Sequence, residues 1–342
     1  MTAPSFRFSE ADFGRAFEAL AGDFALWGPK RFPGRGRFFG TDLVRYAPLE
    51  SFGDLELGEK SCGSPKEAVF PPDETLFHFT GDRFEEPPLE DGRETVIFLR
   101  PCDINGFRRL DAIFLENGPE PDFFYKRRRE KLHFFMIECR ESFENCFCVS
   151  MDANRTDNYK AAFRFGREGI EVQVKDGRFS RYFAHGASSD FAPEFVGENF
   201  KKVELPRADE MPPEMFTAPL WDEYDDRCIA CGRCNTSCVT CTCFSSLDLF
   251  YSDSRNSGER RRVWDGCHLD GFTTVAGGGS YREGKGQRMR FKTFHKIYDF
   301  RKRFGYDMCV GCGRCDDVCP EYISFSDCIN KVSAALKGGG AE

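Results

Sequence analysis

Two runs of four cysteines constrain this chain more than any other feature, because both repeat the spacing two, two and three. The first run is Cys228, Cys231, Cys234 and Cys238, and the second is Cys309, Cys312, Cys315 and Cys319. A chain wraps a four-iron four-sulfur cluster with this spacing, and where two such runs occur, each fourth cysteine ligates the other cluster. The sequence therefore predicts one cluster on Cys228, Cys231, Cys234 and Cys319, and a second on Cys309, Cys312, Cys315 and Cys238.

Zinc is the main alternative occupant, since it also favours paired C-x2-C elements. A structural zinc ion takes four ligands, whereas the two runs supply eight cysteines in cluster order. Pro320 follows the second run, as the dicluster pattern requires, and Val239 stands at that place in the first run. All eight ligands are intact, so we favour clusters over zinc.

The length, charge and hydropathy of the chain limit the classes of protein to which it could belong. At 342 residues the chain is too long for a bare ferredoxin, and its formal charge of −8 argues against general nucleic-acid binding. No apolar run is long enough to span a membrane. The first residues do not resemble a signal peptide, so we expect a cytoplasmic protein whose 17 cysteines are reduced.

The N-terminal half carries a βαβ pattern. Apolar runs at Thr95–Leu99 and Leu132–Ile137 predict buried parallel strands, and Ile104–Leu115 between them has helical periodicity. A helix is also expected over residues 9–21, and a β-hairpin over Ile170–Val174 and Phe179–Phe183.

These patterns predict an α+β fold in which a mixed α/β domain precedes a mostly helical dicluster ferredoxin domain. A proline-rich stretch places the boundary between them. In the later domain, residues 289–304 show a helical pattern, and no strong strand candidate follows Cys228. The expected divisions are residues 1–200 for the first domain, 201–222 for a linker, 223–336 for the ferredoxin domain and 337–342 for a disordered tail.

Four more cysteines follow the two predicted parallel strands. Cys102 comes after the first strand, and Cys139, Cys146 and Cys148 come after the second. Because the carboxyl ends of parallel strands share one sheet edge, we expect these thiols to converge there and to hold a third cluster. Unligated structural thiols and a zinc site are the alternatives. Asp103 is a candidate oxygen ligand, although such residues more often cap a helix.

The other cysteines are expected to have lesser roles. Cys241 and Cys243 follow the first run and are expected to line a cluster pocket or to donate weak hydrogen bonds, with ligation the less favoured alternative. Cys62, Cys267 and Cys328 are interpreted as structural thiols. No two histidines have ligand spacing, so no catalytic residue is predicted. Of the two basic strips, residues 126–129 and 260–262, only the second is expected to dock an acidic partner.

Long segments within Asp226–Lys331 resemble the A subunit of anaerobic sulfite reductase. The segments are Gly258–Trp264, Asp270–Thr273, Val275–Arg282 and Met308–Asp317. The N-terminal half is similar, more loosely, to that subunit and to β subunits of cytosolic sulfur reductase and hydrogenase complexes, through Arg100–Asp103 and Cys146–Cys148.

This resemblance implies a non-catalytic electron-transfer subunit of an NADH-dependent sulfite reductase, relaying electrons between two partner chains. A B subunit would hold flavin and take electrons from NADH, and a C subunit would hold sirohaem and reduce sulfite to sulfide. The sequence itself has neither a dinucleotide fingerprint nor the cysteine spacing of sirohaem enzymes, so both cofactors are expected on the partners. A β subunit of a hydrogenase or polysulfide reductase complex is the alternative.

Overall fold

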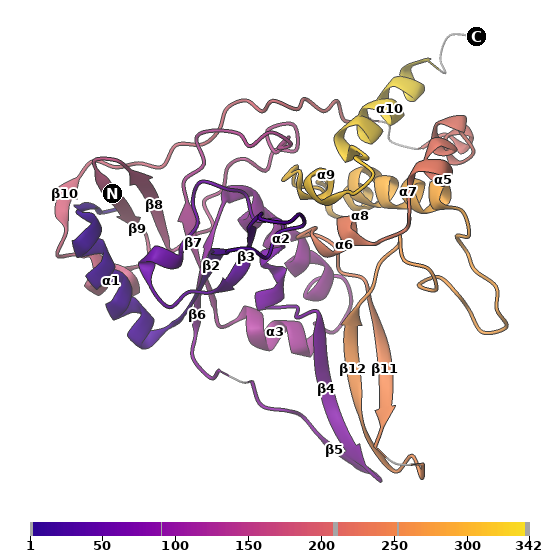
Figure 1. The fold of residues 1–342 in the computed structure, drawn as a ribbon, viewed down its shortest axis with the longest axis horizontal. Coiled ribbons are helices and arrows are strands. Elements are labelled where there is room, and N and C mark those ends of the chain that lie inside the picture. The colour runs from indigo at the N-terminus through magenta and orange to yellow at the C-terminus, as the bar shows by residue number, and fades with distance from the viewer. Residues whose placement is uncertain (1–2, 90, 208–210, 252, 339–342) are drawn as a thin grey trace.

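The computed structural model describes residues 3–89, 91–207, 211–251 and 253–338, and it contains two β-sheets flanked by helices (Figure 1). The larger sheet has eight strands. In spatial order they are β10 (Ala187–Ser189), β1 (Ser5–Phe8), β9 (Gly169–Val174), β8 (Ala161–Gly166), β7 (Leu132–Ile137), β6 (Thr95–Leu99), β2 (Ala25–Phe32) and β3 (Leu43–Pro48). The four central strands β8, β7, β6 and β2 pair in parallel, and the outer pairs are antiparallel.

The predicted βαβ unit is confirmed. Strands β6 and β7 have the expected bounds and pair in parallel, with Thr95 opposite Leu132. Helices α2 (Pro101–Phe114) and α3 (Phe123–Arg129) make the crossover. The predicted helix over residues 9–21 is α1 (Glu10–Asp23), and the side chain of Ser9 accepts a hydrogen bond from the Asp12 amide as its N-cap.

Both faces of the large sheet are buried, because alternate residues of its central strands pack on opposite layers. Phe98 of β6 packs with Phe13 and Phe17 of α1, whereas Ile97 packs with Phe107 of α2. Phenylalanine fills much of the first layer, in which the Phe98 and Phe135 rings meet edge to face at 5.5 Å.

The predicted hairpin is half wrong. β9 forms, but its partner is the preceding strand β8, with Phe165 opposite Ile170. The segment expected as the second strand is helical instead, as η3 (Gly177–Phe179) and α4 (Ser180–Phe183). The Asp176 side chain accepts from the Arg178 amide and caps this turn, and a helical turn brings Phe179 and Phe183 onto the same core.

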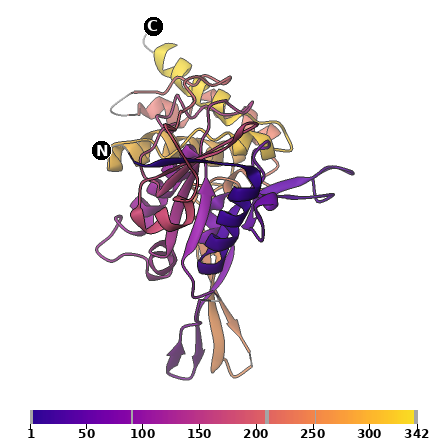
Figure 2. The same ribbon diagram turned by 90° about the vertical axis from the view of Figure 1, so that its left-hand side faces the viewer.

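The smaller sheet corrects the expectation that no strong strand follows Cys228. Its order is β11 (Phe244–Phe250), β12 (Ser257–Trp264), β4 (Asp73–Thr80) and β5 (Arg83–Glu85), all antiparallel. Figures 1 and 2 show it projecting from the body of the molecule. The arginines of the basic strip 260–262 lie on β12 and have carboxylate partners within the chain: Arg260 with Asp248, Arg261 with Asp73, and Arg262 with Glu74 and Asp122.

The remaining C-terminal elements are helical. They are α5 (Glu223–Arg227), α6 (Arg233–Thr236), α7 (Lys285–Phe294), the π-helix η6 (His295–Asp299), α8 (Phe300–Phe304), α9 (Arg314–Val318) and α10 (Phe325–Gly338). The predicted helix over residues 289–304 is therefore confirmed within a longer helical stretch. Short 3-10 turns lie at η1 (Phe52–Asp54), η2 (Pro65–Ala68), η4 (Pro213–Phe216) and η5 (Pro219–Trp221).

The two halves of the chain are joined by strand pairing and by a shared core. β12 pairs with β4, and Phe147 and Met151 pack in one core with Ile297 and Val310. The proposed division at residues 201–222 stays a prediction. Residues 208–210 of that linker and 339–342 of the expected tail lie outside the described residues, and Lys337 belongs to α10. Within the described ranges, no helix is long and apolar enough to cross a membrane.

Candidate metal centres

The two cysteine runs have the same local backbone. The third residue of each run, Ala230 or Gly311, has a positive φ of 55° or 62°. Its amide then points at the first cysteine, at 3.4 Å from Cys228 Sγ and 3.4 Å from Cys309 Sγ. An amide aimed at sulfur favours the thiolate form, which is the form that binds metal. The sequence repeat is therefore a structural repeat.

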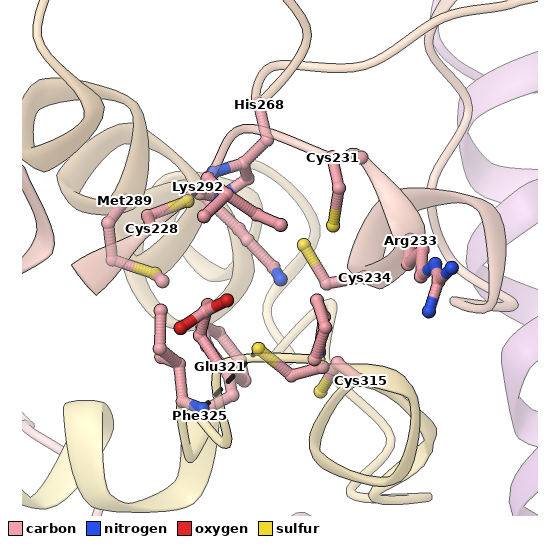
Figure 3. Close-up of a pocket in the computed structure, with 15 residues that line it drawn as sticks. Cys228, Cys231, Arg233, Cys234, His268, Met289, Lys292, Cys315, Glu321 and Phe325 are labelled. Carbon is pink, nitrogen blue, oxygen red and sulfur yellow. Dashed lines mark hydrogen bonds between the residues drawn. The ribbon is translucent and has the colours of Figure 1, made fainter. Parts of the chain in front are cut away.

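The first candidate centre is a pocket between α6, α7 and α9 (Figure 3). The cysteines that line it include the whole set predicted for one cluster, Cys228, Cys231, Cys234 and Cys319. Cys315, which was assigned to the second cluster, also lines it. Cys231 is exposed, so this pocket lies near the surface.

Lys292 and His268 also line this first pocket. Figure 3 shows the Lys292 side chain reaching between the cysteines. Burial disfavours the Lys292 ammonium, but the thiols of Cys234 and Cys315 outweigh burial and raise its pKa. His268 is 1% exposed, and its Nδ1 lies 3.8 Å from Cys228 Sγ. Burial, followed by the charge of Lys292, lowers the pKa of His268 to about 3, so its ring is neutral.

The cysteines of the second predicted ligand set lie near one another, because Cys309 interacts with Cys238 and Cys312, and Cys315 with Cys309 and Cys312. Burial raises the pKa of Cys309 to about 12, and the nearby thiols of Cys238 and Cys312 add to that shift. Lys296 is buried beside this group, where its Nζ donates to Thr240 Oγ1 at 2.7 Å. Burial disfavours its charged form, but Cys238 and other thiols outweigh burial and raise its pKa.

The third candidate centre is a second pocket, at the carboxyl ends of β6 and β7. As the sequence predicts, Cys102, Cys139, Cys146 and Cys148 all line it. Cys312 joins them from the second run, and Cys146 Sγ lies 3.6 Å from the Cys312 carbonyl oxygen. We call this the N-terminal pocket. Burial raises the pKa of Cys148 to about 12, with Cys146 the next cause.

Asp103 has a different role from the one considered for it. It is fully buried, and both carboxylate oxygens accept hydrogen bonds from the Arg314 guanidinium, with NH2 at 2.8 Å. Tyr46 OH donates to the same carboxylate at 2.9 Å. The pair joins α2 to α9, so Asp103 ties the N-terminal pocket to the second cysteine run.

Backbone contacts also join the segment around Phe147, beside the N-terminal pocket, to the second cysteine run. The Phe147 amide donates to the Gly311 carbonyl oxygen at 2.8 Å. A Cβ atom on Gly311 would lie 2.5 Å from the Phe147 backbone, and one on Gly313 would lie 2.0 Å from the Asn145 carbonyl oxygen. Glycine is therefore required at both positions by close approach as well as by φ.

Three other cysteines lie near the first run. Asn235, which is buried, places Nδ2 at 3.8 Å from Cys241 Sγ and 3.3 Å from Cys267 Sγ. Cys241 also contacts Cys238, which fits the weak hydrogen bond expected for it. Cys267 and Cys243 interact as well, and burial raises the pKa of Cys243.

The last two cysteines lie elsewhere. Cys328 is buried, with its Sγ 3.4 Å from Thr293 Oγ1, and Cys62 lines neither pocket.

Sequence reasoning missed the buried cations. Lys66, Lys292 and Lys296 are each 2–3% exposed, and within the described residues none of them forms an ion pair with a carboxylate. A buried ammonium group costs several kcal/mol unless an opposite charge compensates it. The spacing of these lysines gave no signal, because each becomes informative only when the fold places it beside sulfur.

These cations indicate that the thiol groups fit anionic clusters. Burial keeps several thiols protonated, and coordination removes that proton and leaves a thiolate. The resulting negative charge would compensate the buried lysines. Among the residues that the structure describes, no three His, Cys, Asp or Glu side chains converge closely enough for a single metal ion.

Two comparisons with known proteins bear on this geometry. The sequence family described as a 4Fe-4S dicluster domain matches residues 227–323. The chain is also 28% identical over 335 residues to the Sulfhydrogenase 2 subunit beta of Pyrococcus furiosus. The alignment covers 88% of this chain and 93% of that protein. The comparisons support an iron–sulfur protein that is related to this sulfhydrogenase subunit.

Proposed function

We propose that this chain is an electron-relay subunit of an oxidoreductase complex, with the bond-making chemistry on its partners. The supporting observation is that thiols gather in two pockets, with Cys238, Cys309 and Cys312 close to one another, and that nearby buried lysines form no ion pair with a carboxylate in the described part of the chain. A bound four-iron cluster takes up and releases single electrons. The chain's own cysteines would bind the irons through sulfur, the amides of Ala230 and Gly311 would donate to cysteine sulfur, and burial would limit the access of water.

The proposed ligands follow the sequence prediction. Cys228, Cys231, Cys234 and Cys319 would hold the first cluster, and Cys309, Cys312, Cys315 and Cys238 the second. Cys102, Cys139, Cys146 and Cys148 would hold a third. The contact between Cys146 and the Cys312 carbonyl oxygen supports a path between the N-terminal pocket and the second ligand set.

The partner chemistry that we favour is that of a hydrogenase or sulfur reductase complex. The match to a sulfhydrogenase β subunit extends over both halves of the chain and supports this choice over our first interpretation. A sulfite reductase with flavin and sirohaem chains is the second candidate, favoured by the runs Val275–Arg282 and Met308–Asp317. Both candidates give this chain the same relay role.

Two measurements test the proposal. The first is iron and acid-labile sulfide per chain after anaerobic purification, where about twelve irons are expected from three four-iron clusters. About eight irons would show that the N-terminal thiols hold no cluster. A colourless protein that contains zinc would contradict the proposed electron-relay function. The second is an anaerobic pull-down from the native cell. A nickel–iron chain among the partners supports the first candidate, and a sirohaem chain supports the second.

A further inference from the structure

The first pocket contains a histidine with an unpartnered ring nitrogen, His268, and a buried cation, Lys292, whose polar neighbour is the Cys234 thiol. His268 Nε2 is buried without a hydrogen-bond partner. Lys292 lies on α7, is 3% exposed and has no ion pair with a carboxylate within the described ranges. Its Nζ lies 4.9 Å from the centre of the Phe325 ring, a contact too weak to offset burial of the charge.

We propose that Lys292 and His268 raise the reduction potential of the cluster held by Cys228, Cys231, Cys234 and Cys319. This inference rests on the proposed function. Lys292 would present a positive charge to the cluster, and the His268 ring, whose Nδ1 lies 3.8 Å from Cys228 Sγ, would donate an N–H to sulfur.

The direction of the effect follows from charge. Reduction adds one negative charge to the cluster, and a nearby cation stabilises the reduced form more than the oxidised form. Hydrogen bonds to sulfur act in the same direction, and both are known means of tuning cluster potentials. The low effective dielectric constant of a buried site makes each interaction stronger than it would be in water.

The surrounding charges do not cancel this effect. Arg288 is buried near His268, and its NH1 forms an ion pair with Asp270 at the surface. Arg233 and Glu321, which also line the pocket, are exposed and therefore screened by water. Lys292 is thus the buried charge in this pocket that lacks a carboxylate among the described residues.

The test is a potentiometric titration of the full chain, followed by electron paramagnetic resonance. The signal absent from Cys231→Ser identifies this cluster. In Lys292→Met, we expect its reduction equilibrium to shift at least tenfold toward the oxidised form, a fall of about 59 mV for one electron. Lys292→Arg should restore most of the potential, because it keeps the charge.

Lys302→Met is the matched control, since Lys302 is exposed on the neighbouring helix α8, and it should leave the potential unchanged. If Lys292→Met loses the cluster, His268→Leu gives the second test and should lower the potential by a smaller amount. Full iron content with an unchanged potential in both variants would overturn the inference alone. Wild-type protein without iron or sulfide would overturn the proposed function as well.

Discussion

The N-terminal pocket and the first pocket both place cations beside cysteines, but they partner those cations differently. In the N-terminal pocket, Lys60 pairs with Asp317 at 2.6 Å, and Arg314 pairs with Asp103. In the first pocket, Lys292 has sulfur neighbours and forms no ion pair with a carboxylate within the described residues. Paired charges fix one part of the protein against another, whereas an unpaired buried charge acts on whatever binds beside it. The first arrangement therefore fits a role in assembly, and the second fits the proposed role of Lys292 beside a cluster.

The two cysteine runs also differ in how closely they pack against the rest of the chain. Ala230 and Gly311 occupy equivalent positions with nearly equal φ, and Gly311 lies against the backbone of Phe147. The second run is buried between the two halves of the chain, while the first run faces outward, with Cys231 exposed. Because of this difference, the first pocket is the candidate site for electron exchange with a partner. The N-terminal pocket is the candidate for an internal electron-transfer site.

Removing a ligand should have the largest effect, because a cluster that loses one thiolate becomes labile. Cys146→Ser is expected to remove about four irons per chain by eliminating the N-terminal cluster. Cys231→Ser should remove a similar number from the first pocket, and both losses can be measured as iron and acid-labile sulfide. Cys62→Ser is the control and should retain full iron. Unchanged iron in Cys146→Ser would show that the N-terminal thiols bind no cluster.

Breaking the Asp103–Arg314 pair should destabilise the protein by about 3–5 kcal/mol, because it leaves a buried charge without compensation. Asp103→Leu tests this by anaerobic denaturant titration. Adding Arg314→Met removes the second charge, so the double variant should recover much of the lost stability. A double variant as unstable as Asp103→Leu would show that the carboxylate acts through contacts other than this pair.

The sequence predicts those parts of the site that depend on local spacing. The two cysteine runs specify their own turns, and the strands β6 and β7 place Cys102 and Cys139 at one edge by parallel pairing alone. It does not predict the second sheet, because β12 is dense in arginine and its partners Glu74, Asp73 and Asp122 lie far away in the chain. The role of Lys292 also depends on tertiary packing, since a lysine on a helix is normally exposed.

Gly311→Ala should cost about 2 kcal/mol of stability, since its Cβ would collide with the Phe147 backbone and alanine disfavours positive φ. Ala230→Gly is the matched substitution at the equivalent position of the outward-facing run. It relieves an unfavourable φ and should leave stability within about 1 kcal/mol of wild type. Denaturant midpoints of the two variants compare them directly. Equal stability would mean that the second run is not held against Phe147 in solution.

The smallest expected effect comes from making the N-terminal pocket resemble the first. Asp317→Asn keeps the shape of the side chain but removes the carboxylate that compensates Lys60, whose Nζ lies 3.8 Å from Cys146 Sγ. The potential of the N-terminal cluster, identified by its absence in Cys146→Ser, should rise in a potentiometric titration. We expect a shift below tenfold, because the Asp317 side chain is 25% exposed and water screens part of its charge. A fall in potential would contradict the assignment of Lys60 as a cation held in balance by Asp317. If the potential rises in Asp317→Asn by as much as it is expected to fall in Lys292→Met, water screens the Asp317 charge less than its exposure indicates. The electrostatic difference between the two pockets would then be smaller than their ion pairs suggest.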